Sequence, residues 1–163
     1  MIKDRILKEY GIESYLGKLQ ISYKETIIKS SQDTVTIEKT IAGTKNFVKI
    51  TLLVKPDENH DPKKRTKVIV ALTDENEVKW FRSDHLKTIE SGVSLAMNNG
   101  PILSYPVIGV SVELLQFQIG KGTTNAMISA AASQCLLNAI KSTSPILLEP
   151  YMRLEIQVKD SHV

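Results

Sequence analysis

A glycine-rich stretch at residues 119–127, IGKGTTNAM, has the residue types of a phosphate-binding turn. Glycines let the backbone approach a ligand closely, a lysine supplies positive charge, and two threonines supply hydroxyl groups. The residues concerned are Gly120, Lys121, Gly122, Thr123 and Thr124. Because an alanine-rich run follows them, the threonine amides are expected at the positive end of a helix. The composition of this turn therefore favours contact with an anion.

The spacing of the turn bears on which anion it would hold. A Walker loop reads G-x-x-x-x-G-K-[ST], but here Leu115 stands five places before Gly120 and a glycine follows Lys121. The turn also lacks a G-x-G-x-x-G pattern and is too short to encircle a diphosphate. Two uses stay open: an N-cap supplied by Thr123 or Thr124, or contact with a single phosphate such as that of an RNA backbone.

Other reactive residue types form no recognisable constellation. His60, His85 and His162 are scattered and lack an i, i+4 partner. Cys135 is the single cysteine and lies on the helical run, where it is expected as a small core residue. The carboxylates fall on exposed phases of strands or in polar turns. The sequence thus predicts no catalytic residue, no metal site and no disulfide.

A second candidate for phosphate contact lies in the polar, proline-containing loop 55–67. The loop is expected to be solvated, and an exposed insertion without function is the alternative. Its candidate residues are Lys63, Lys64, Arg65 and Lys67. The 163-residue chain carries a net charge of only +3, from 21 basic and 18 acidic side chains, so nucleic-acid affinity would have to come from such local clusters.

The chain carries no sign of membrane insertion or secretion. No apolar run reaches the roughly 20 residues of a membrane span. The N-terminal stretch MIKDRILKEY has helical spacing and mixed charge, without the apolar core of a secretory signal. Gly11 is expected to end that helix, and the uncapped start indicates a fragment of a longer protein.

Alternating apolar residues predict strands at 35–41 and 48–54, joined by a hairpin tip at 42–46 with Gly43 and Asn46 as turn residues. Shorter strands are expected at 68–72 and 77–81. A further strand ends at Ile119.

That last strand changes phase part of the way along its length. Val110, Val112 and Leu114 share one phase, whereas Phe117 and Ile119 continue in the other, which predicts a bulge near Leu114. A final strand is expected at 152–158.

Two helices complete the expected fold. One begins with Ser83 as its N-cap and ends at Asn99-Gly100-Pro101, and its Gly92 indicates close packing against a neighbour. The other runs from Asn125 to Ser142. The order of strands and helices predicts an α+β fold in which two helices cover one face of a sheet.

Three stretches resemble the elongation factor G family of translational GTPases. Residues 9–27, EYGIESYLGKLQISYKETI, are similar to the end of that family's third domain. Residues 100–114, GPILSYPVIGVSVEL, and 130–158, which include LLEPYM, are similar to patterns in its fourth domain and at the junction with its fifth.

The resemblance implies a domain division and a fold. Residues 1–28 would be the last helix and strand of the third domain, 29–148 the fourth domain, and 149–163 the start of the fifth. The fourth domain is a two-layer α+β sandwich with a mixed sheet and a left-handed βαβ crossover. The GTPase domain, with its GTP and Mg, would lie elsewhere in a full-length parent, so this chain would not be an enzyme and would hold no cofactor.

The resemblance also implies which end of the domain contacts the ribosome. The family's fourth domain reaches the ribosomal decoding centre through two tip loops, which correspond to residues 42–46 and about 118–125 here. These two loops are therefore expected side by side at the far end of the sheet. The implied contacts with ribosomal RNA are Gly43, Thr44, Lys45 and Asn46 in the first loop, and the five residues from Gly120 to Thr124 in the second. No contact with membrane or DNA is implied.

The tip loops depart from the translocase pattern. Translocating members read Q-S-G-G-R-G-Q-Y-G and H-D-V-D-S-S-E, whereas this chain has TIAGTKNFV and GKGTTNA. The string G-x-x-T-T-x-x-M-I-S-A resembles the mitochondrial branch that works with ribosome recycling factor. It implies splitting of post-termination ribosomes in the mitochondrial matrix. A divergent or organellar translocase is the first alternative. A small-molecule kinase-like domain of the same topology is the second, disfavoured by the short loop and a missing acidic base.

Overall fold

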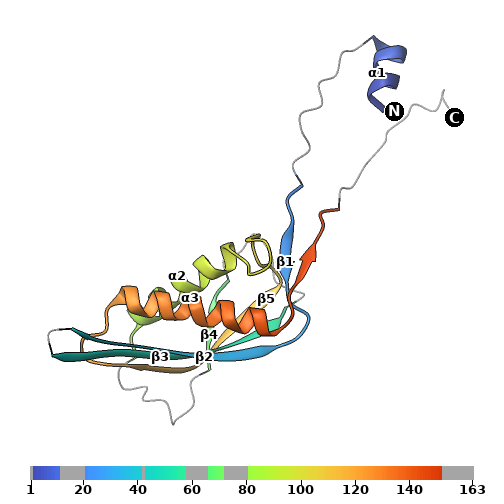
Figure 1. Cartoon of the computed structure of the whole chain (residues 1–163). Coiled ribbons are helices and arrows are strands. Elements are labelled where there is room, and N and C mark those ends of the chain that lie inside the picture. The colour runs from blue at the N-terminus through green and yellow to red at the C-terminus, as the bar shows by residue number, and fades with distance from the viewer. Residues whose placement is uncertain (1, 12–20, 42, 58–65, 72–80, 152–163) are drawn as a thin grey trace. The chain divides into compact units, whose positions relative to one another are not determined.

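The computed structural model describes residues 2–11, 21–41, 43–57, 66–71 and 81–151 (Figure 1). The chain divides into two units: Met1–Ser22 with Met152–Val163, and Tyr23–Tyr151. The predicted domain boundaries themselves stay a prediction.

The first unit contains helix α1, Ile2–Tyr10, as its spacing predicts. The Gly11 amide donates to the Leu7 carbonyl at 3.0 Å and closes the last turn. The expected strand at 152–158 lies outside the described residues, as does nearly all of the one expected at 77–81.

The second unit is built on a mixed four-stranded sheet in the order β2-β3-β5-β4. The strands are β2 (Ser31–Ile41), β3 (Thr44–Pro56), β4 (Val68–Val70) and β5 (Val110–Ile119). β3 pairs antiparallel with both β2 and β5, whereas β4 runs parallel to β5. The parallel pair requires a crossover connection.

Helices α2 (Ser83–Asn98) and α3 (Asn125–Ser142) lie side by side on one face of this sheet (Figure 1). The predicted α+β class, with two helices over a mixed sheet, is confirmed. α2 provides the crossover between β4 and β5, and the hand of that crossover stays a prediction. α2 begins at Ser83 rather than being capped by it: Arg82 holds the N-cap position, and its amide donates to His85 Nδ1 at 3.3 Å.

The core lies between the sheet and the two helices. The inward side chains of β3, Val48, Ile50, Leu52 and Val54, are fully buried, as their alternation predicts. Gly92 of α2 is buried against α3, where an added Cβ would meet the Ser129 carbonyl. The expected close packing at this glycine is therefore confirmed.

The predicted bulge in β5 is confirmed. Thr51 pairs with Gln116, but Leu52 pairs with Leu114, so Leu115 is the extra residue on its strand. The extra residue brings Phe117 to the same buried face as Leu114 despite the phase change in the sequence.

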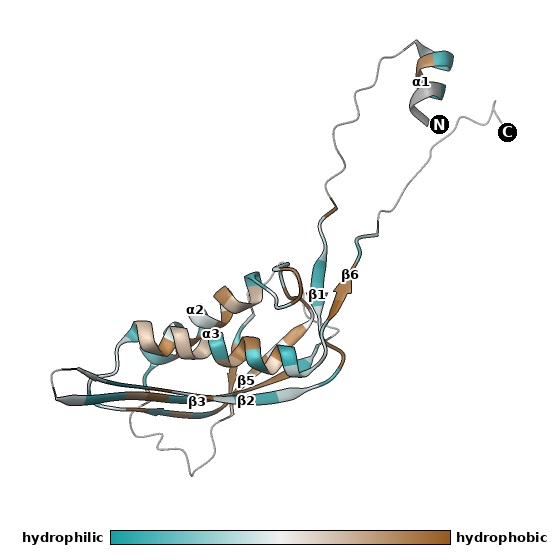
Figure 2. Cartoon of the chain, in the orientation of Figure 1, coloured by the Kyte–Doolittle hydropathy of each residue, from teal (hydrophilic) through white to brown (hydrophobic). Residues whose placement is uncertain are grey.

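A small second sheet closes the end of the unit from which the chain leaves toward both termini. β1 (Lys24–Thr26) pairs antiparallel with β6 (Ile146–Leu148), and Figure 2 shows the polar β1 beside the hydrophobic β6. β6 has only three residues, too few for an alternating pattern to predict it.

Glu25 of β1 is fully buried at this end. Its carboxylate accepts the amides of Ile102, Leu103 and Tyr105 at 3.0, 2.9 and 3.2 Å. An added Cβ on Gly100 would run into the same carboxylate. We call these five residues the base clasp.

Candidate functional site

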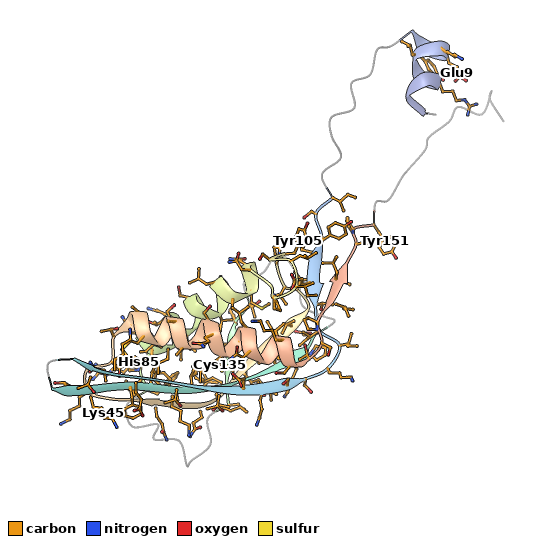
Figure 3. The ribbon with its side chains drawn as sticks, in the orientation of Figure 1. Glu9, Lys45, His85, Tyr105, Cys135 and Tyr151 are labelled. Carbon is orange, nitrogen blue, oxygen red and sulfur yellow. The ribbon has the colours of Figure 1, made fainter. Side chains whose placement is uncertain are left out.

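The two predicted tip loops lie at the same end of the sheet. Val48 pairs with Ile119 across β3 and β5, and the Gly120 amide donates to the Phe47 carbonyl at 2.8 Å. Figure 3 shows Lys45 at this end of the sheet, opposite Tyr105 of the base clasp. The prediction that these loops come together across the fold is confirmed, and residues 43–47 with 120–124 are called the tip below.

Glycine is required in the second loop because the two loops pack directly on each other. A Cβ on Gly120 would lie 2.9 Å from Phe47 Cδ1 and 3.1 Å from the Lys45 carbonyl oxygen. A Cβ on Gly122 would run into the side chain of Asn46. The glycines that resemble a phosphate-binding loop in sequence thus serve contact between two segments of the chain.

The two threonines have separate structural roles. Thr124 caps α3, and its Oγ1 accepts the Met127 amide at 3.3 Å, which confirms one of the two predicted caps. Thr123 Oγ1 donates to the Phe47 carbonyl at 2.6 Å and accepts the Gly120 amide at 3.1 Å. The Thr123 amide donates to the Gly120 carbonyl at 3.1 Å and is thus bonded within the chain, while contact of this turn with a phosphate stays a prediction.

Asn46 is not the turn residue that the sequence predicted. β2 ends at Ile41 and β3 begins at Thr44, so the turn is shorter than expected and Asn46 lies within β3, opposite Lys39. Asn46 is 5% exposed, and its buried Oδ1 has no hydrogen-bond partner among the described residues. Its contact with Gly122 makes it a packing residue between the loops, while Gly43 holds the turn itself at a φ of 77°.

The exposed positive charge of the tip comes from lysines. Lys45 and Lys121 both face solvent, and Lys45 Nζ lies 3.6 Å from Glu38 Oε2. Both partners of this pair are more than half exposed, so solvent screens it and it contributes little to stability. Lys39 is a further exposed lysine close to the turn and was not among the predicted contacts. Its position two residues before the end of the predicted strand was the available signal.

Of the second predicted phosphate patch, the structure describes Lys67 alone, and this residue lies away from the tip. Lys67 is exposed and directly precedes β4, whose Val68 pairs with Val112, far along β5 from Gly120. Lys63, Lys64 and Arg65 lie outside the described residues.

The remaining candidates for chemistry are structural where they are described. Cys135 is fully buried on the side of α3 that faces the sheet, and burial raises the pKa of its thiol to about 12. The predicted core role of this cysteine is therefore confirmed. The His85 ring lies 5.5 Å from that of Phe117 and 6.5 Å from that of Phe81. The described residues contain no group of three potential metal ligands and no helix long and apolar enough to cross a membrane.

The chain matches known proteins along nearly its whole length. The family model described as "Elongation factor G, domain IV" matches residues 19–144. "Ribosome-releasing factor 2, mitochondrial" of Danio rerio and of Mus musculus are each 35% identical over the full chain, and that of Drosophila persimilis is 37% identical over 96% of it. The chain spans only about a fifth of the length of these relatives.

A solved structure shows the same fold. A crystal structure of a protein from Thermus thermophilus superposes with a TM-score of 0.67 at 20% identity, covering 89% of this chain and 20% of that one.

Proposed function

Because the chain belongs to the elongation factor G domain IV family, we propose that it is the ribosome-binding arm of a mitochondrial translational GTPase. In this proposal the full-length parent splits post-termination ribosomes into subunits together with ribosome recycling factor. GTP and Mg bind the parent's GTPase domain, and this arm carries no catalytic residue of its own. The parent acts in the mitochondrial matrix, as the names of its relatives suggest.

The construction of the tip is the observation that carries the proposal. Two turns far apart in sequence converge and present Lys45 and Lys121 to solvent. A lysine ammonium is a point charge, which holds a phosphate without reading a base. A protruding end with exposed lysines suits the backbone of ribosomal RNA.

The composition of the tip supports recycling over translocation. The translocase pattern places a histidine and acids in the second loop, and residues 120–124 contain neither. A kinase-like function has no support from the turn, because the Gly120 and Thr123 amides donate within the chain rather than toward a nucleotide.

The experiment measures subunit splitting by the full-length parent, with ribosome recycling factor, across a salt series. Lys45→Ala and Lys121→Ala should each weaken ribosome binding and lower the slope of log affinity against log salt by about 0.7 to 0.9. Lys87→Ala is the matched control, because Lys87 is 77% exposed and makes a similarly weak pair with Asp84 at 3.9 Å. Unchanged splitting and slope in the double variant Lys45→Ala/Lys121→Ala would overturn the proposal.

A second measurement separates this arm from a nucleotide-binding domain. Calorimetry of the isolated chain with millimolar GTP or ATP should give no stoichiometric heat. Magnesium-dependent binding of one nucleotide per chain would favour the kinase alternative instead.

A further inference from the structure

The hydroxyl of Thr123 lies at a junction between the two loops of the tip. It donates to the Phe47 carbonyl at 2.6 Å, accepts the Gly120 amide at 3.1 Å, and so connects the start of α3 to β3. Phe47 follows Lys45 by two residues, and Thr123 follows Lys121 by two residues. Each lysine is thus two residues from the same junction.

The backbones that carry the two lysines are also in direct contact. The Cβ position of Gly120 is 3.1 Å from the Lys45 carbonyl oxygen, and that of Gly122 is filled by the Asn46 side chain. Gly120 and Gly122 flank Lys121, while Asn46 follows Lys45. Neither loop can shift along the other without breaking the Thr123 bonds or these close contacts.

We propose that Thr123 is a positioning residue, which locks the two loops together so that Lys45 and Lys121 meet neighbouring phosphates of one RNA strand as a single two-point contact. A preorganised pair of charges loses less conformational freedom on binding than two loops that must be ordered separately. Thr123 acts through the lysines and does not itself touch the RNA. This inference rests on the proposed function, since it concerns how the tip binds the ribosome.

A role for Thr123 in fold stability alone makes a different prediction. Loss of stability would weaken binding equally whether or not Lys45 is present. Loss of positioning matters only while both lysines are there to be positioned, so the two effects are separated by a double-mutant cycle.

The chain offers a matched control for the loss of a threonine hydroxyl. Thr143, at the other end of α3, is 3% exposed, and its Oγ1 donates to the Ile140 carbonyl at 2.6 Å. Thr143→Val therefore removes a hydrogen bond of the same length to the same kind of acceptor, far from both lysines.

The experiment measures binding of the full-length parent to purified ribosomes at one salt concentration. Thr123→Val should weaken binding about three- to tenfold, the range expected for one hydrogen bond. Thr123→Ser, which keeps the hydroxyl, should bind within about twofold of the wild type, as should Thr143→Val. In a Lys45→Ala background, Thr123→Val should add less than about twofold. Where Thr123→Val does not fold, Thr123→Ala removes the same hydroxyl and is interpreted in the same way.

The possible results separate the positioning role of Thr123 from the proposed contact of the lysines with the ribosome. Unchanged binding by Thr123→Val, or an equal loss in the wild-type and Lys45→Ala backgrounds, would overturn the positioning role while leaving the lysine contacts intact. Wild-type binding by the Lys45→Ala and Lys121→Ala variants would instead overturn the proposed function, and the positioning role with it.

Discussion

The base clasp and the tip both contain a glycine packed against a buried side-chain oxygen, but the hydrogen bonding of that oxygen differs between the two regions. In each, the Cβ position of a glycine is filled by a buried side-chain oxygen: Glu25 Oε2 at Gly100, and Asn46 Oδ1 at Gly122. The Glu25 carboxylate accepts three backbone amides. Asn46 Oδ1 has no partner among the described residues. A buried acceptor without a partner costs about 1 to 3 kcal/mol, so the two ends differ in what they contribute to stability.

This difference follows the position of each region in the fold. The base clasp fastens β1, through which the chain enters the unit, to the loop that follows α2. The tip lies at the free end, where the proposed ribosome contact is made. Locally unfavourable features are typical of functional sites, and they are offset here by the well-bonded base and the core between the two regions.

The largest expected effect is at the base. Glu25→Ala should lower the free energy of unfolding by about 3 kcal/mol, because it removes three hydrogen bonds from backbone amides to a fully buried carboxylate. Urea denaturation of the chain measures this. Glu113→Ala is a control, since its carboxylate pairs with Lys55 at 2.6 Å but is 19% exposed, and it should cost about 1 kcal/mol or less. A small loss of stability in Glu25→Ala would contradict the proposed difference between the base clasp and the tip.

The two glycines allow a direct comparison of the regions. Gly100→Ala should destabilise by about 2 to 3 kcal/mol, because the fixed Glu25 carboxylate and the Tyr105 carbonyl, 2.6 Å from the new Cβ, cannot move apart. Gly122→Ala should cost about 1 kcal/mol, since the Asn46 oxygen is not held by a hydrogen bond and its side chain can rotate. Equal losses of stability in the two variants, measured by thermal denaturation, would contradict the difference between the base clasp and the tip.

Asn46→Leu should raise the free energy of unfolding, whereas the glycine substitutions lower it. The substitution replaces a buried, unpartnered oxygen with an apolar group of similar volume, so the free energy of unfolding should rise by up to about 1 kcal/mol. Chemical denaturation with linear extrapolation gives the value. A loss greater than about 1 kcal/mol would mean that the Asn46 amide is bonded after all, and that the tip resembles the base.

The smallest expected effect is on Cys135, which lies on the sheet-facing side of α3 between the two regions (Figure 3). Labelling of its thiol requires opening of the core, so Lys45→Ala and Lys121→Ala, which change exposed side chains of the tip, should leave the labelling rate within about twofold. Glu25→Ala should raise the rate in step with the lost stability. Faster labelling in either lysine variant would show that opening of the tip reaches the core.

The Cys135 thiol also makes the free energy of unfolding depend on pH. Burial raises its pKa from 9.0 to about 12, so the protonated thiol is favoured in the folded state. This contribution to stability is fully present below pH 9 and is lost as the pH rises from 9 toward 12, because the unfolded thiol ionises first. Denaturation of Cys135→Ala over the same range should lack this loss.

Local patterns predicted much of the fold. The bounds of α3, Asn125–Ser142, followed from a threonine cap and an apolar stripe, and the bulge in β5 followed from a phase change within the strand. Both signals are contained in the neighbouring residues. The convergence of the tip loops followed from the family resemblance and from the phase change near Leu114, which carries the far end of the strand out to the first loop.

The remaining features depend on partners far away in the chain. Glu25 binds amides 77 to 80 residues later, and Thr123 binds a carbonyl 76 residues earlier. No local pattern signals such contacts. Asn46 was misplaced because asparagine is common in turns, and a turn shorter than expected moved it into a strand.

The bulge at Leu115 affects how the length of this chain can change in evolution. Because Thr51 pairs with Gln116 and Leu52 with Leu114, deletion of Leu115 would restore an ordinary ladder and leave every other side chain of β5 on its present face. Deletion of Phe117, by contrast, would turn Gln118 and Ile119 to the opposite face and change how β5 enters the turn that carries Lys121. Leu115 is therefore a position where β5 can lose a residue while the tip keeps its orientation.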